Sequence, residues 1–285
     1  MKAARFHARN DIRIDDVDEP QVRPGSVKIQ VAWCGICGTD LHEFLEGPIF
    51  VPSPGHPHPL SQEEAPVTMG HEFSGTIVEL GDGVQALEVG DNVVVEPYFV
   101  CDECPPCKAG NYHLCTKMGF IGLSGGGGGL GSMVVVDTRW VHKIGDIPLD
   151  EAALIEPLSV AHHAVTRSGA KAGDVALVGG SGPIGLLTAA VLKSQGVTTV
   201  ISELSEARKE KAISSGVADL VIDPSQEDLQ VRILELTDGV GADVAGKVDL
   251  KPFITGRIAL KELVEKGFNT LIHHNDTAVK ILVHP

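Results

Sequence analysis

The chain has 285 residues, of which 43% are hydrophobic and 21% are charged, and it contains 33 glycines. This balance is typical of a globular protein and excludes collagen-like and disordered chains; at ~150 residues per domain it predicts two domains. The formal net charge of −15 disfavours nucleic acid and anionic membranes as partners, because like charges repel.

Targeting signals are not expected. Residues 1–15 lack the apolar stretch of a signal peptide, and the uncharged stretch 175–192 is interrupted by glycines and a proline. We therefore expect no membrane span and a cytoplasmic location. In that reducing compartment, six cysteines indicate metal binding or catalysis rather than disulfides.

The N-terminal half is predicted to be rich in β-structure. Four runs of β-branched and apolar residues, separated by glycine and proline turns, predict strands at 27–31, 75–80, 92–95 and 133–136. A helix is predicted next, at 151–166.

Beyond that helix the pattern changes to an alternation of strands and helices. Strands are predicted at 175–178, 199–202, 220–222 and 242–245, and helices at 184–194, 205–215 and 227–236. Such alternation predicts βαβ units and a parallel sheet. The final segment, Lys251 to Pro285, predicts a short helix at 260–267 and an edge strand at 279–283.

The first cysteine cluster places four thiols within 15 residues, at Cys101, Cys104, Cys107 and Cys115. Four thiolates this close can surround one tetrahedral zinc ion. The alternatives are a disulfide knot or four buried free thiols, and the reducing compartment disfavours the first of them. Because the protein supplies all four ligands, the predicted zinc is structural rather than catalytic.

A second candidate metal site combines Cys37, which follows a predicted strand, with His71 and Glu72, which begin 34 residues later. A thiolate, an imidazole and a carboxylate suit a catalytic zinc with an open fourth position. Alone this pattern is weak, since a lone histidine is usually an ordinary core or surface residue. The closed four-cysteine site in the same chain strengthens it. We interpret Cys34 as a small buried apolar residue.

A glycine-rich turn, Gly180-x-Gly182-x-x-Gly185, follows a predicted strand and opens a predicted helix. Gly180 permits the tight turn, and Gly182 lets backbone N–H groups approach a pyrophosphate at the helix N-terminus. Glu203 lies 21 residues after Gly182, where a carboxylate accepts from ribose hydroxyls and repels a 2′-phosphate, which favours NAD over NADP. The alternative is a tight turn with an incidental surface glutamate.

Taken together, these motifs resemble those of the zinc-dependent medium-chain alcohol and polyol dehydrogenases, and most of all the (R,R)-butanediol dehydrogenases, which also act as acetoin reductases. The resemblance covers nearly the whole chain. It is carried by the following segments: 35–42, 70–75, the four-cysteine loop, 156–159 and 180–185, and more finely by 45–50, 96–98 and 119–125.

The resemblance implies an α/β fold class with two domains. Residues 1–150 would form a GroES-like zinc-binding catalytic domain, completed by residues 250–285. Residues 151–249 would form a truncated Rossmann domain with a doubly wound parallel sheet, which binds NAD.

Family roles are implied for individual residues. Cys37, His71, Glu72 and Glu156 would hold the catalytic zinc, Glu156 directly or through water, and Asp40 would be hydrogen-bonded to His71. Thr39 and His42 would pass the hydroxyl proton to solvent; the alternatives are a turn hydroxyl for Thr39 and a surface histidine for His42. The implied NAD-binding residues are Gly180, Gly182, Pro183, Ile184, Gly185, Glu203 and Arg208.

The implied activity is hydride transfer between NAD and a small secondary alcohol or vicinal diol, of the 2,3-butanediol and acetoin type, with two zinc ions per chain. The expected partner is a small alcohol or ketone substrate, and full-length relatives are expected to be homo-oligomers. Two alternatives remain open: a sorbitol- or xylitol-type polyol dehydrogenase, or a non-catalytic remnant that binds zinc and nucleotide.

The sequence departs from the family after Ala245. The chain runs from 244–248 straight into 251–257, a stretch that lies near the C-terminus in the family. A helix and two strands of the dinucleotide domain are therefore missing, about 60–70 residues. The missing part includes nicotinamide contacts and the subunit-contact strand. Ser132 and Met133 also replace an expected Glu-Tyr pair. We therefore expect lower activity and stability than in a full-length relative.

Overall fold

The computed structural model of the chain describes residues 1–243, 254–274, 278 and 280–285. It divides into two compact units, which are described separately. Unit 1 comprises Met1–Glu156, Gly256–Ile272 and Ile281–Pro285, and unit 2 comprises Pro157–Thr255 and His273–Lys280. Within the described residues, no helix combines the length and the apolar character needed to cross a membrane.

Unit 1 is built mainly from short antiparallel strands. Its first part contains β1 (Lys2–Ala8), β2 (Asp11–Asp16), β3 (Ser26–Gly35), α1 (Gly38–Glu46), β4 (Val67–Thr68), β5 (Glu72–Leu80), β6 (Asn92–Val95), β7 (Tyr98–Phe99), α2 (Pro105–Lys108), η1 (Tyr112–Leu114), β8 (Gly119–Phe120), β9 (Met133–Asp137), η2 (Thr138–Trp140), β10 (Val141–Lys143) and α3 (Leu149–Ala152). The chain returns near its C-terminus through β14 (Ile254–Ala259), η4 (Leu260–Glu262), η5 (Leu263–Phe268), α8 (Asn269–His273) and β15 (Lys280–His284).

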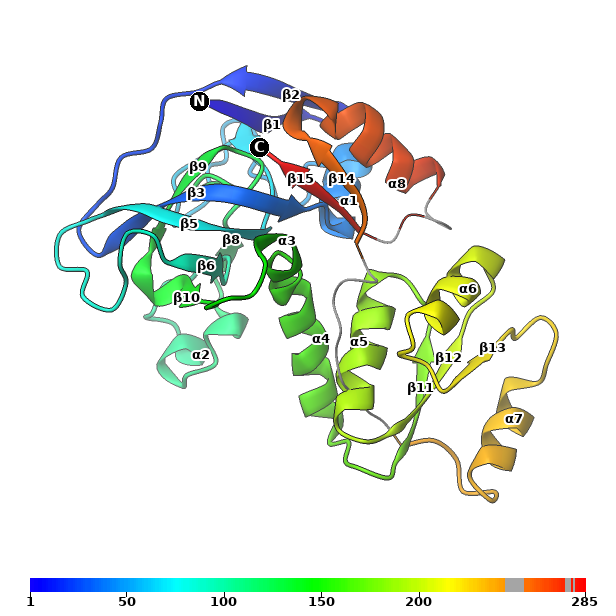
Figure 1. Cartoon of the computed structure of the whole chain (residues 1–285). Helices are drawn as coiled ribbons and strands as arrows, with labels where there is room; N and C mark the ends of the chain where they lie inside the picture. Colours follow the sequence, from blue (N-terminus) through cyan, green and yellow to red (C-terminus); the bar gives the residue numbers. More distant parts are fainter. Residues whose placement is uncertain (244–253, 275–277, 279) are drawn as a thin grey trace. The chain divides into compact units, whose positions relative to one another are not determined.

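One sheet of seven strands organises this unit, in the order β10-β6-β5-β3-β15-β14, with β9 also paired to β3. Strand β3 pairs with β5 along most of its length. On its other side, the first half of β3 pairs with β9, while Cys34 and Gly35 at its end pair with β15. Figure 1 shows β15, in red, beside β3. The C-terminal strand therefore supports the end of β3, from which the chain continues into α1.

The four strands predicted between residues 27 and 136 are confirmed as β3, β5, β6 and β9. The C-terminal prediction is partly wrong. Strand β15 lies inside the sheet rather than at its edge, because Ile281, Leu282 and Val283 are buried in succession and need cover on both faces. Strand β14 was not predicted, and the predicted helix at 260–267 consists of the 3₁₀ and π-helical segments η4 and η5.

The single helix predicted at 151–166 is also corrected, because the structure has two helices here, α3 and α4 (Ile155–Ser168). Pro157 explains the break. A proline has no N–H to continue an earlier helix, and its ring clashes with the carbonyl four residues before it, at Ala153. Proline is tolerated in the first turn of a helix, which is its position in α4.

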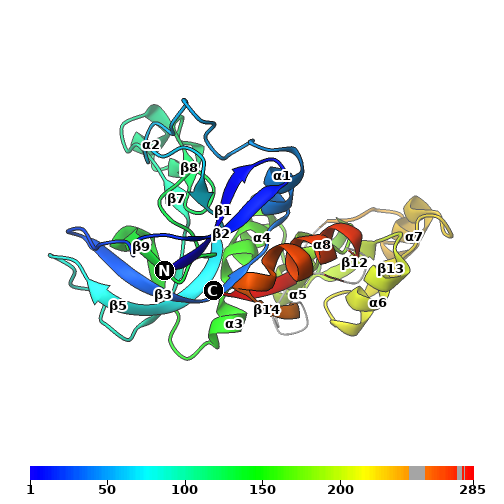
Figure 2. The same ribbon diagram turned by 90° about the horizontal axis from the view of Figure 1, so that it is seen from above.

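A small lobe in unit 1 carries the four clustered cysteines. Strands β7 and β8 pair in it, and α2 and η1 belong to the loop between them. Figure 2 labels α2, β7 and β8 in this lobe. A contact between Tyr112 and Trp140, whose rings lie 5.5 Å apart, and an ion pair between Arg139 and Asp102 hold the loop to η2.

Unit 2 contains a parallel sheet with the strand order β11-β12-β13. After α4 it consists of β11 (Val175–Gly179), α5 (Pro183–Ser194), β12 (Thr198–Ser202), α6 (Glu206–Ser214), β13 (Leu220–Ile222) and α7 (Leu229–Leu236). Ile233 of α7 packs against Val200 and Ile222 of the sheet. This alternation confirms the predicted α/β fold class.

The fourth predicted strand of this sheet, 242–245, lies partly outside the described residues, since the structure does not describe residues 244–253. Residues 242 and 243 are not in strand geometry. Nevertheless the backbone N–H of Asp243 donates to the carbonyl of Val175, and the Val175 N–H lies 3.4 Å from Asp243 Oδ2. The chain therefore runs beside β11 at this point.

Candidate active site

Cys37 is held at the junction between β3 and α1. It is the N-cap residue of α1, with φ −91° and ψ 158°, so it has left the strand but not yet entered the helix. Its backbone N–H donates to Asp40 Oδ2 at 2.8 Å. This bond satisfies an N-terminal backbone donor and fixes the thiol at the end of the sheet.

His71 and Glu72 are positioned by two glycines. Gly70 has φ +96°, and a Cβ there would lie 2.7 Å from both Cys34 Sγ and the Leu130 backbone nitrogen, so only glycine fits. Cys34 is fully buried, in agreement with its interpretation as a small apolar residue. Gly35 pairs in register with Glu72, and a Cβ at Gly35 would overlap Glu72 Oε2. The missing side chain therefore makes room for the carboxylate.

The ligand atoms of Cys37, His71 and Glu72 all lie within 4.8 Å of one another. His71 is 6% exposed and Glu72 1%. Ligand atoms of a tetrahedral zinc lie ~3.6 Å apart, so small side-chain rotations suffice to enclose the ion. Three donors of mixed type fit a zinc centre that keeps one position open.

The electrostatics of this group also favour a cation. Burial alone lowers the pKa of His71, but Asp40, Cys37 and Glu72 outweigh it and raise this pKa to about 10. Asp40 Oδ1 lies 3.6 Å from His71 Nδ1, which is too long for the predicted hydrogen bond, and within the described residues His71 Nδ1 has no hydrogen-bond partner. The carboxylate nevertheless faces Nδ1, which leaves Nε2 as the ligand nitrogen. Three acidic groups around one imidazole create a negative field that attracts a divalent ion.

The other predicted catalytic residues do not belong to the group formed by Cys37, His71 and Glu72, although Thr39 contacts Cys37. The Cys37 thiol lies 3.7 Å from Thr39 Oγ1, on the first turn of α1. His42 is exposed on the same helix. Glu156 is in the first turn of α4. Burial and then the charge of Glu156 raise the pKa of Tyr98, but Glu156 does not belong to the group within 4.8 Å.

The four clustered cysteines, Cys101, Cys104, Cys107 and Cys115, also lie with their sulfurs within 4.8 Å of one another. Hydrogen bonds from the backbone of Cys107 and Thr116 lower the pKa of Cys104 to about 6. Burial and the neighbouring thiols raise the pKa of Cys107 to about 12. Four sulfurs this close together fit one divalent cation, and four thiolates are typical of structural zinc.

The glycine turn of unit 2 has the geometry of a phosphate-binding loop. Gly180 has φ +85°, and a Cβ at Gly185 would overlap the Gly180 carbonyl oxygen, so strand and helix approach closely. Helix α5 begins with Gly182 as N-cap and Pro183 in its first turn, and no side chain caps it. Backbone N–H groups of this first turn therefore remain for an anionic ligand.

Glu203 follows β12 and is 8% exposed. Its carboxylate accepts hydrogen bonds from Ser181, Leu204 and Ser205. Burial raises the pKa of Glu203, but these bonds outweigh it and lower the pKa below its usual value, so the group is anionic at neutral pH. Arg208 lies in the first turn of α6, where its backbone N–H bonds to Ser205 Oγ at 3.5 Å.

Two further residues shape these sites and were not predicted. Glu43 of α1 is fully buried, and its carboxylate accepts from the backbone N–H groups of Ile49, Phe50 and Val51. It thereby fastens the loop after α1. Ser181 occupies a variable position of the glycine motif, so the motif gives no signal for it.

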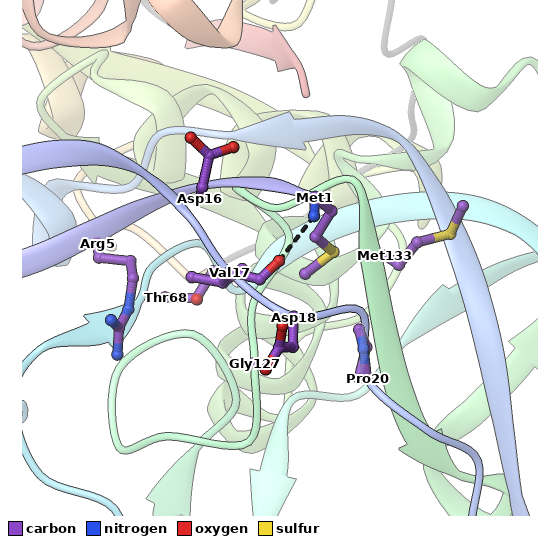
Figure 3. A pocket seen from close by; sticks show the side chains of 9 residues that line it. All are labelled: Met1, Arg5, Asp16, Val17, Asp18, Pro20, Thr68, Gly127 and Met133. Carbon is purple, nitrogen blue, oxygen red and sulfur yellow. Dashed lines mark hydrogen bonds between the residues drawn. The ribbon is translucent and has the colours of Figure 1, made fainter.

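A pocket of about 440 Å³ in unit 1 is lined by residues outside the sites described above (Figure 3). They are Met1, Arg5, Asp16, Val17, Asp18, Pro20, Thr68, Gly127 and Met133. The Met1 ammonium donates to the Val17 carbonyl at 2.7 Å, and the Arg5 guanidinium bonds to the Pro66 carbonyl. None of the predicted metal ligands lines this pocket.

Comparison with known proteins assigns the chain to a family. Residues 23–146 match the alcohol dehydrogenase GroES-like domain, and residues 183–248 match the zinc-binding dehydrogenase domain. The chain belongs to the zinc-binding, medium-chain alcohol dehydrogenase family.

Its relatives include (R,R)-butanediol dehydrogenases. The chain is 51% identical to that enzyme of Neisseria gonorrhoeae over all of this chain and 99% of the relative, and 47% identical to that of Bacillus subtilis over 98% and 82%. The crystal structure of 2R,3R-butanediol dehydrogenase from Bacillus subtilis is similar with a TM-score of 0.91 and 39% identity, covering 100% of this chain and 99% of that one.

The comparison with the Neisseria protein also measures an internal gap. The alignment extends over 352 positions, whereas this chain has 285 residues, so 67 positions have no residue here. Since nearly the whole of both chains is aligned, these positions lie inside the alignment. The number agrees with the 60–70 residues predicted to be missing; Ala245, where the sequence places the gap, lies outside the described residues.

Proposed function

We propose that this chain is a zinc-dependent NAD oxidoreductase that transfers a hydride between NAD and a small secondary alcohol or vicinal diol, of the 2,3-butanediol and acetoin type. The observation that carries the proposal is the grouping of Cys37, His71 and Glu72 in a chain 51% identical to a (R,R)-butanediol dehydrogenase. A mixed donor set with an open position supports catalysis rather than a purely structural metal.

In this proposal residues 1–150, completed by 250–285, form the catalytic domain and hold two zinc ions. The four clustered cysteines hold a structural ion. Cys37, His71 and Glu72 hold the catalytic ion, with Glu156 as a further ligand, directly or through water. Zinc bound there would polarise the alcohol oxygen and lower the pKa of its hydroxyl.

The protein residues orient the donors and move the proton. Asp40 Oδ1 faces His71 Nδ1 at 3.6 Å, and a small side-chain shift on zinc binding would form the hydrogen bond that fixes the tautomer and orientation of this imidazole. Thr39 receives the hydroxyl proton and His42, exposed on the same helix, delivers it to solvent. The thiol of Cys37 within 3.7 Å of Thr39 Oγ1 supports this assignment, because it places the hydroxyl beside the metal ligands.

Residues 151–249 are proposed as the NAD-binding domain. Gly180, Gly182, Pro183, Ile184 and Gly185 would hold the pyrophosphate, while Glu203 and Arg208 would flank the adenosine ribose. The anionic carboxylate of Glu203 supports NAD over NADP, because it repels a 2′-phosphate. We place the gap of 67 positions after Ala245, where it removes nicotinamide contacts and the subunit-contact strand and so reduces turnover.

The protein is proposed to act in the cytoplasm, which agrees with the finding that none of its six cysteines, all within the described residues, forms a disulfide. The test of the proposal combines zinc analysis of the purified chain with steady-state oxidation of 2,3-butanediol and of sorbitol by NAD. Preferential turnover of butanediol supports the assignment of a vicinal diol as substrate. Preferential turnover of sorbitol contradicts that assignment and indicates a polyol dehydrogenase. Absence of turnover despite bound zinc and nucleotide identifies a non-catalytic remnant.

A further inference from the structure

Ser181 is a buried hydroxyl inside the glycine turn, with no exposed surface. Its backbone N–H donates to Glu203 Oε2 at 2.9 Å, and its side-chain hydroxyl reaches the same oxygen at 3.0 Å. The turn after β11 is thus tied by two bonds to the carboxylate at the end of β12. A third link, from the backbone N–H of Gly180 to the Ser202 carbonyl at 2.8 Å, holds the same two segments together.

The Glu203 carboxylate is already saturated by donors of the protein. Besides the two bonds from Ser181 to Oε2, the other oxygen, Oε1, accepts from the backbone N–H groups of Leu204 at 2.8 Å and Ser205 at 2.9 Å. An ionised carboxylate offers about four lone-pair sites. A ribose hydroxyl that bonds to Glu203 must therefore take the place of one of these donors.

Only one of the four donors can leave without moving the backbone. Three are N–H groups fixed by the turn and by the start of α6, whereas the Ser181 hydroxyl rotates about its own side-chain bond. The hydroxyl has a second acceptor, because the Arg208 carbonyl oxygen lies 3.1 Å from Ser181 Oγ. With one proton and two acceptors, it keeps a hydrogen bond in either orientation.

We propose that Ser181 is a positioning residue for the cofactor, and that its hydroxyl gives up the hydrogen bond to Glu203 when the ribose binds. In the empty site its hydroxyl holds the carboxylate; when a ribose hydroxyl arrives, it turns to the Arg208 carbonyl and frees one lone pair of Oε2. This inference rests on the NAD binding proposed above. A 2′-phosphate replaces the 2′-hydroxyl, and its charge is repelled by the Glu203 carboxylate, so the remaining 3′-hydroxyl is kept away from Oε2 and the exchange does not occur. Ser181 thereby adds to the selectivity for NAD.

The exchange predicts that removal of the Ser181 hydroxyl raises the affinity for a ligand with a free ribose. In the native chain, ribose binding replaces a charge-assisted bond of Ser181 by a neutral one, and charge-assisted bonds are about twice as strong. In Ser181→Ala this cost disappears, and ribose meets a carboxylate with a vacant site. We expect 5′-AMP to bind about fivefold tighter, and 2′,5′-ADP to bind unchanged within about twofold.

Isothermal titration of the full chain with 5′-AMP and with 2′,5′-ADP tests this, alongside melting temperatures. Ser194→Ala is the matched control: it lies on α5, and its hydroxyl donates only to the Val191 carbonyl among the bonds described, at 3.0 Å. If Ser181→Ala does not fold, Ser181→Cys keeps the side-chain shape with a somewhat larger atom but donates only weakly, and it must show the same selective gain.

The outcomes separate the inference from the proposed function. Tighter 5′-AMP binding with unchanged 2′,5′-ADP binding supports the exchange, because mere disruption of the turn weakens both ligands. Unchanged or weaker 5′-AMP binding by a folded variant overturns it while leaving the NAD assignment intact. A native chain that prefers 2′,5′-ADP, or that binds neither fragment, overturns the proposed cofactor and the inference with it.

Discussion

Replacing Gly35 by alanine is expected to release the catalytic metal without unfolding unit 1. Gly35 ends β3 and faces Glu72 in the register between β3 and β5. An added methyl group overlaps Glu72 Oε2 and lies 3.3 Å from both Cβ and Cδ of that side chain. Because the overlapping atom is the end of a flexible side chain, the carboxylate rotates away and the strand register survives.

The magnitudes follow from this geometry. Overpacking by one methyl group costs about 1–2 kcal/mol, which lowers Tm by roughly 2–8 °C in a chain of this size. Withdrawal of a ligand oxygen is expected to weaken zinc binding at least ~100-fold, the upper range for loss of a supporting group. The four-cysteine site is built elsewhere in unit 1 and is expected to keep its ion.

The assay is zinc content after gel filtration in buffer without chelator, measured together with Tm. We expect one zinc ion in Gly35→Ala and two in the native chain. Gly38→Ala is the matched control, because a Cβ there meets no atom within 4 Å although the residue directly follows Cys37. A folded Gly35→Ala variant that retains both ions as firmly as the native chain would refute Glu72 as a ligand.

Four further predictions concern the metals, the nucleotide and the gap. Mild chelation of the native chain removes one zinc ion, whereas loss of the four-cysteine ion accompanies unfolding, as elemental analysis and circular dichroism will show. Gly185→Ala, whose Cβ overlaps the Gly180 carbonyl, weakens 5′-AMP binding more than ~10-fold by titration, whereas Gly179→Ala, with open space, does not. Glu203→Gln narrows the preference for 5′-AMP over 2′,5′-ADP. Because the pKa of Glu203 is lowered from its ordinary 4.5, its ionised carboxylate stabilises the fold above that pH, and this stability is lost as the pH falls through the lowered pKa. Insertion of the unmatched segment of the Neisseria relative after Ala245 raises turnover ~10²-fold while 5′-AMP binding changes little; equal turnover of both chains shows that the segment is dispensable.

The sequence specifies the parts of the sites that depend on residue type and spacing. Four cysteines within one short loop, and a glycine turn between a strand and a helix, are local patterns, and the structure places each as a compact group. The pairing of Cys37 with His71 and Glu72 is not local. It depends on β3 and β5 lying side by side, and the sequence indicated it only through the mixed ligand types and the four-cysteine site in the same chain.

What the sequence could not supply are contacts made by the fold. The position of β15 inside the sheet depends on β14, a strand whose short mixed sequence gave no signal. The donors that saturate Glu203 come from the turn after β11 and from the start of α6, and only their convergence shows that a ribose must displace one of them. Likewise, the burial of Glu43 is explained by backbone donors of the following loop.

The measurement that tests the account most directly is NADH formation by the purified, zinc-loaded chain with 2,3-butanediol as substrate, followed by absorbance. We predict slow turnover, about 10²-fold below a full-length relative, that exceeds turnover of sorbitol and is abolished in Cys37→Ala. Butanediol oxidation no faster than in Cys37→Ala, from a chain that carries two zinc ions and binds 5′-AMP, would contradict the account.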